Sequence, residues 1–126
     1  ALLAGKLYGL SHAQLVHALG LAGTPNVAMR QTRVGELSHW KGVAFANAAR
    51  NGVFAATLAK LGMSGPAPIF EGEMGFFKQV SGTTSNLPKL PAEDFMMLKS
   101  YIKHFPVEYH AQTAVEAALL LQQDID

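Results

Sequence analysis

The chain contains no cysteine, which excludes disulfide bonds, a thiolate nucleophile and thiolate metal sites. It also carries little charge. Asp, Glu, Lys and Arg make up 15 % of its 126 residues, against about a quarter in typical soluble domains. The net charge of +1 gives no electrostatic footprint for nucleic acid, so no nucleic-acid partner is expected.

Long apolar runs are missing too, although hydrophobic residues make up 49 % of the chain. No run of about eighteen apolar residues lacks a charge or a turn former, so no membrane-spanning helix is predicted. A free-standing domain this small usually has more charged residues on its surface. We therefore expect part of it to be buried against a partner subunit or the rest of a longer protein. The start, ALLAGKLYGLS, resembles the tail of an earlier helix in a truncated chain rather than a signal peptide.

Local signals in the first part of the sequence predict helices. A helix over residues 1–8 precedes a second one that runs from His12 to about Gly23. Ser11 is a suitable N-cap for the second helix, and Gln14 completes a capping-box pattern. Pro25 ends this helix, because the residue before a proline disfavours the helical conformation.

The longest predicted helix begins at Leu37 or His39 and runs to Leu61, with Gly62 as its stop. Its polar residues do not fall on one stripe. A helix that is apolar on nearly all sides is typical of the centre of a large helical domain.

The remainder is less regular. A short helix is expected within residues 70–80, and a connection rich in Ser, Thr, Gly and Pro follows over residues 81–91. Residues 95–105 predict a strand, or a short helix followed by a strand. A final helix opens at Tyr109 or His110.

Four potentially cationic side chains lie within twelve positions, in the stretch QTRVGELSHWKG or directly before it: Arg30, Arg33, His39 and Lys41. Arginine forks and helix N-termini bind carboxylates well, so this stretch can form one wall of a site for an anion. A basic turn in water is the alternative. Lys41, inside an apolar helix, must extend to solvent, pair with a carboxylate or lose its proton.

A second cluster lies in KHFPVEYHAQ, which contains Lys103, Glu108 and His110. In an extended segment Glu108 and His110 share a face. A carboxylate beside an imidazole is a usable acid–base pair near neutral pH. The alternative is an ordinary surface strand followed by a capped helix.

Both clusters belong to longer stretches that resemble one family. PNVAMRQTRVGELSHWKGVAFANAARNGVFAATLAKLGMSGP, FEGEMGFFKQVSG and KHFPVEYHAQTAVEAA resemble the MmgE/PrpD family, which includes 2-methylcitrate dehydratases and cis-aconitate decarboxylases. The form GELSxWKG looks closest to the dehydratase branch.

The resemblance implies a large all-helical domain followed by a smaller α+β lid domain, with the active site in the cleft between them. We therefore expect a mainly α chain, with residues 1–94 in the helical domain and residues 95–126 at the start of the lid. Family members are typically cytoplasmic homodimers that need no metal or organic cofactor. They act on small di- and tricarboxylates.

The resemblance also implies roles for single residues. Lys41 and Lys103 match the family's active-site lysines. The decarboxylases have a histidine where this chain has Glu108, whereas the dehydratases have one that matches His110, so the proton-transfer role stays open between these two residues. Three further cations are expected to bind substrate: Arg30, Arg33 and His39.

The expected function is that of a 2-methylcitrate dehydratase-like hydro-lyase fragment in propionate catabolism. A cis-aconitate decarboxylase or an epimerase of a related acid is the alternative within the enzymes. A non-catalytic helical oligomerisation module is the alternative of another class. The family's other catalytic residues lie in N-terminal helices absent from this sequence, so we expect the 126-residue polypeptide alone to be inactive.

Overall fold

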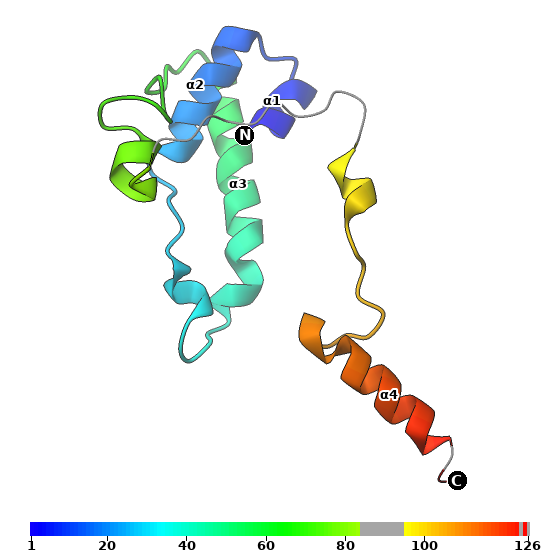
Figure 1. Ribbon diagram of the computed structural model, residues 1–126. Helices are drawn as coiled ribbons and strands as arrows, with labels where there is room; N and C mark the ends of the chain where they lie inside the picture. The colour runs from blue at the N-terminus through cyan, green and yellow to red at the C-terminus, as the bar shows by residue number, and fades with distance from the viewer. Residues whose placement is uncertain (84–94, 124, 126) are drawn as a thin grey trace. The chain divides into compact units, whose positions relative to one another are not determined.

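The computed structural model describes residues 1–83, 95–123 and 125. The chain forms two compact units, Ala1–Asn86 (unit 1) and Leu87–Asp126 (unit 2) (Figure 1). The described residues form helices and loops without a strand, so the prediction of a mainly α chain is confirmed. In order, the elements are α1 (Leu2–Leu7), α2 (His12–Gly23), η1 (Arg30–Arg33), α3 (Trp40–Lys60), η2 (Phe77–Ser81), η3 (Met96–Lys99), η4 (Tyr109–Ala111) and α4 (Gln112–Gln122).

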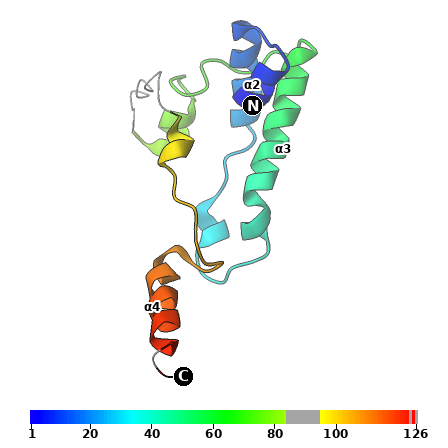
Figure 2. The same ribbon diagram turned by 90° about the vertical axis from the view of Figure 1, so that its right-hand side faces the viewer.

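Within unit 1, α1 and α2 both contact α3, and α2 runs antiparallel to it (Figures 1 and 2). The core of this unit consists of small side chains and one aromatic ring: Ala18, Ala55, Ala56, Ala59 and Phe77. Alanine and glycine at these contacts let the helix backbones approach closely. The consequence is a tightly packed but small hydrophobic core.

The predicted boundaries of α2 are confirmed. The Ser11 hydroxyl accepts a hydrogen bond from the Gln14 backbone N–H at 3.3 Å, and the Gln14 side chain accepts one from the Ser11 N–H at 3.0 Å. The Gln14 amide also donates to the Ala59 carbonyl at 3.5 Å, so the cap ties α2 to α3. The helix ends at Gly23, and its C-cap residue Thr24 directly precedes Pro25.

Helix α3 begins at Trp40, slightly later than predicted, and Gly62 follows its end with a φ of 92°, as expected of a helix stop. The buried residues of α3 all lie in its second half: Gly52, Ala55, Ala56 and Ala59. Large side chains stay exposed in both halves, since Phe45 is 84 % and Phe54 is 63 % accessible. Unit 1 does not surround α3 in the way that its apolar sequence predicts.

The loop after α3 returns over α2 and leads to a group of three aromatic rings, Phe70, Phe76 and Phe77. Regular structure in the segment 70–80 starts only at Phe77, where a turn of π-helix begins. The helix predicted within 70–80 is therefore shorter than expected.

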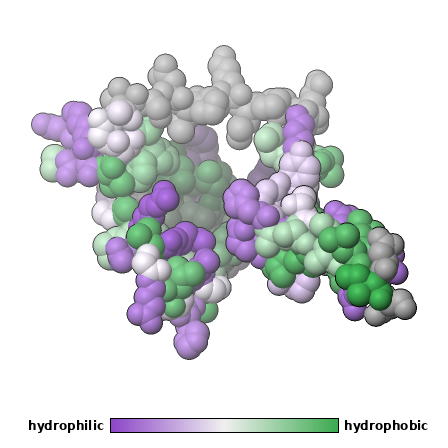
Figure 3. All heavy atoms as spheres, turned by 60° about the horizontal axis from the view of Figure 1, so that its bottom comes forward, coloured by the Kyte–Doolittle hydropathy of each residue, from purple (hydrophilic) through white to green (hydrophobic). Residues whose placement is uncertain are grey.

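Unit 2 consists of two short 3-10 helices and α4 in its described residues. The short helix predicted within residues 95–105 is present as η3, but the strand predicted after it is not formed there. A strand needs a partner strand, and the described residues of this unit offer none. The final helix was correctly predicted, and hydrophobic side chains remain on the surface of α4 (Figure 3).

Two predictions concern positions outside the described residues. Residues 84–91 of the predicted connection lie there, and so does residue 94, the last residue before the predicted domain boundary. That boundary stays a prediction. Among the helices that the structure describes, none has the length and apolar character needed to cross a bilayer.

Candidate functional site

The four cationic residues predicted in unit 1 lie on consecutive pieces of structure. Arg30 and Arg33 open and close η1, His39 is the N-cap of α3, and Lys41 is in its first turn. All four are exposed, and none makes a side-chain hydrogen bond or ion pair with any residue that the structure describes. The positive charges of Arg30, Arg33 and Lys41 are therefore available to an anion, and the His39 imidazole is free to hydrogen-bond it.

A network of amide side chains joins the segment before η1 to α3. The Asn51 amide donates to the Asn26 side-chain oxygen at 2.7 Å, and Asn26 donates in turn to the Ala22 carbonyl at 3.0 Å. The Arg50 guanidinium donates to the side-chain oxygens of Asn47, at 2.9 Å, and Asn51, at 3.4 Å. This network fixes where the chain leaves α2 on its way to η1.

The same amides border a cavity of about 540 Å³ beside the first half of α3. Its other walls include Trp40, from the stretch QTRVGELSHWKG, and Thr32, from η1. None of the four residues predicted to bind an anion lines this cavity. The sequence interpretation missed the asparagines, although Asn47 and Asn51, four residues apart on a helix, share one face.

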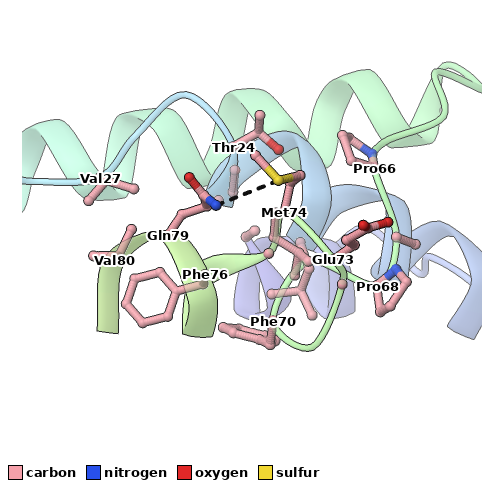
Figure 4. A pocket seen from close by; sticks show the side chains of 18 residues that line it. Thr24, Val27, Pro66, Pro68, Phe70, Glu73, Met74, Phe76, Gln79 and Val80 are labelled. Carbon is pink, nitrogen blue, oxygen red and sulfur yellow. Dashed lines mark hydrogen bonds between the residues drawn. The ribbon is translucent and has the colours of Figure 1, made fainter. Parts of the chain in front are cut away.

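A larger cavity, of about 690 Å³, lies between the end of α2 and the segment 66–80 (Figure 4). Its walls are mostly apolar, and Glu73 is the one charged side chain among the residues that line it. The Gln79 amide contacts the Met74 sulfur at 3.6 Å across this region. None of the predicted site residues borders it.

In unit 2, the predicted residues are held by short-range contacts. The Lys103 ammonium donates to the Val107 carbonyl at 2.8 Å, and the Glu108 carboxylate accepts from the backbone N–H of His110 at 2.6 Å. The expected pairing of Glu108 with the His110 imidazole in an extended segment does not occur, because Tyr109–Ala111 is a 3-10 helix capped by Glu108.

The Gln112 side chain binds the loop that carries these residues. Its oxygen accepts from the N–H groups of His104, at 3.1 Å, and Phe105, at 3.0 Å, and its NH₂ donates to the Phe105 carbonyl at 3.0 Å. The NH₂ of Gln112 also donates longer hydrogen bonds, of 3.4 Å each, to the Val107 and Glu108 carbonyls. The sequence interpretation placed Gln112 in the second cluster but gave it no role.

The structure thus gathers the candidates into two groups, one in each unit. The first group is Arg30, Arg33, His39 and Lys41, and the second is Lys103, Glu108 and His110. Their union in one site stays a prediction. No set of three histidine or carboxylate side chains in the described residues is placed to hold a metal ion.

One comparison with known proteins identifies the family. The model of the MmgE/PrpD N-terminal domain matches residues 1–87, which include the whole first group of candidates. No solved structure matches the chain. Since the match covers more than half of the sequence, the chain belongs to the MmgE/PrpD family.

Proposed function

We propose that this chain is part of a hydro-lyase that eliminates water from a small tricarboxylate, as 2-methylcitrate dehydratases do in propionate catabolism. The family generally consists of dehydratase- and lyase-type enzymes. The observation that carries the proposal is the run of exposed cationic side chains at η1 and the start of α3, none of which is neutralised by a described residue. A polycarboxylate is the matching ligand.

Elimination of water requires cations that hold the carboxylates and stabilise the charge that develops in the transition state. We assign this role to Lys41 and Lys103, with Arg30, Arg33 and His39 binding the substrate further out. The three N–H donors of an ammonium allow Lys103 to keep its bond to the Val107 carbonyl while it binds a carboxylate.

The reaction also requires a base that removes a proton next to a carboxylate and an acid that protonates the leaving hydroxyl. We assign proton transfer to His110 and an orienting role to Glu108. The short bond from the His110 N–H to the Glu108 carboxylate supports this assignment. This bond holds the backbone of His110 in place. No described residue hydrogen-bonds the His110 imidazole, so the imidazole is available for proton transfer.

The remaining parts of the proposal concern the intact protein. Residues 1–94 belong to the helical domain and residues 95–126 begin an α+β lid. The protein works as a cytoplasmic homodimer without a metal or organic cofactor. The exposed apolar side chains on α3, Phe45 and Phe54 among them, support burial against further protein surface.

Replacing Lys41 by Met in the intact protein tests the proposal. The variant keeps most of the apolar stem but loses the charge, so we expect turnover at least about 100-fold lower with an unchanged circular dichroism spectrum. Turnover is followed by the ultraviolet absorbance of the conjugated double bond. Lys6→Met makes the same change on an exposed residue of α1 and should leave turnover intact.

Near-normal turnover by Lys41→Met would show that Lys41 does not have the assigned role in binding carboxylates and stabilising charge. A panel of carboxylic acids separates the dehydratase from the two alternatives within the enzymes, since loss of carbon dioxide or inversion of a centre gives different products. An intact protein that turns over none of these acids favours the helical oligomerisation module.

A further inference from the structure

The loop Lys103–Glu108 carries two of the proposed site residues but lacks regular secondary structure. Pro106 removes one backbone donor from it, and one hydrogen bond between its own backbone groups is present, from the Val107 N–H to the Phe105 carbonyl. Such a short loop needs outside partners for its remaining polar groups if it is to hold one conformation.

Gln112 supplies those partners. It is the first residue of α4 and is half-buried. Its amide oxygen takes two successive backbone N–H groups, those of His104 and Phe105, and its NH₂ returns to the carbonyl of Phe105. One side chain thus binds both the N–H and the C=O of Phe105 and anchors the loop to a helix.

Gln112 and Lys103 also meet at one acceptor. The Val107 carbonyl receives the Lys103 ammonium at 2.8 Å and the Gln112 NH₂ at 3.4 Å. Because the ammonium has three N–H donors, Lys103 keeps this bond when it binds a carboxylate. The Gln112 contact therefore helps to fix the carbonyl to which the ammonium is tied, and with it the position of the ammonium.

We propose that Gln112 is a positioning residue, which holds the loop so that the Lys103 ammonium can bind a substrate carboxylate. This inference rests on the carboxylate-binding role proposed above for Lys103. Gln112 does not touch the substrate itself. It acts through the backbone of residues 104, 105 and 107, and so its contribution should depend on the presence of Lys103.

The test measures binding of tricarballylate to the intact protein by calorimetry. This tricarboxylate has no hydroxyl to eliminate, so it binds without reacting. We expect Gln112→Met, which keeps the length of the side chain but loses all five bonds, to raise the dissociation constant about ten-fold. Lys103→Met should raise it at least as much.

The double variant decides the question. If Gln112 acts through Lys103, the double variant binds no more than about two-fold worse than Lys103→Met alone. Independent losses that multiply overturn the inference but leave the role of Lys103 standing. Binding by Lys103→Met that equals wild type instead removes the proposed role of Lys103, and the inference with it.

One further variant controls for folding. Gln122→Met makes the same change near the end of α4, on an exposed residue, and should bind as wild type does. If Gln122→Met is as impaired as Gln112→Met, the inference is wrong.

Discussion

At the scale of single residues, one contact links the end of α2 to the middle of α3. The Asn51 amide donates to Asn26 at 2.7 Å, and Asn26 also binds the Ala22 carbonyl at the end of α2. The chain between Pro25 and η1 has no regular structure. The position of η1, and of Arg30 and Arg33 on it, therefore depends in part on two neutral amides.

Replacing Asn51 by Ala should lower the free energy of unfolding by about 1 kcal/mol, the usual value of one hydrogen bond. Combined with Asn26→Ala in a double-mutant cycle, it should show a coupling of about 0.5–1 kcal/mol, measured by urea denaturation of the intact protein. Thr57→Ala is the control. The Thr57 hydroxyl donates to the Val53 carbonyl on its own helix and lies outside this network, so its coupling to Asn26→Ala should be near zero.

At the scale of elements, the predictions that succeeded rest on signals a few residues apart. The capping box of Ser11 and Gln14 fixes the start of α2, and Gly62, with its positive φ, fixes the end of α3. The strand predicted within residues 95–105 failed because aromatic and branched residues favour a strand only where another strand can pair with it.

In the candidate site, too, the features that the sequence predicted depend on residues close together in the chain. The charged candidates were visible because cations within a few positions form a local pattern. The contact between Asn26 and Asn51 joins residues 25 positions apart, and the role of Gln112 depends on how a proline loop folds back onto a helix. Neither is a local pattern, so sequence periodicity and motif spacing did not reveal them.

Packing between α2 and the loop after α3 depends on Gly20. A Cβ at this position would fall on the Pro66 carbonyl oxygen and lie 2.9 Å from its nitrogen. Because backbone atoms cannot move aside as a side-chain end can, Gly20→Ala should destabilise the intact protein by about 1–3 kcal/mol. Loss of this contact would also open the wall of the larger cavity that contains Pro66.

Gly42→Ala is the matched control for that change. Gly42 also lies in a helix, α3, and a Cβ there meets nothing within 4 Å. Alanine has the better helix propensity, so this variant should be neutral or more stable by up to about 1 kcal/mol. Thermal unfolding compares the two variants. Equal melting temperatures would show that the loop can move away from a Cβ at position 20 without loss of stability, which contradicts the prediction.

At the scale of the whole molecule, the chain exposes far more apolar surface than a free-standing domain normally does. Phe45, Leu98 and Ile102 are 84 %, 80 % and 96 % accessible, and charged residues make up only 15 % of the sequence. In each unit, the described residues leave such side chains uncovered. The proposed site residues are likewise exposed rather than enclosed.

The 126-residue polypeptide by itself should therefore bind a hydrophobic dye such as anilinonaphthalene sulfonate strongly and show no dehydratase turnover. Elimination needs a site from which water is excluded and in which acid, base and cations are fixed together. The intact protein, measured at equal molar concentration, should bind less dye and form the conjugated product. Clear turnover by the polypeptide alone would mean that residues 1–126 already contain a complete site.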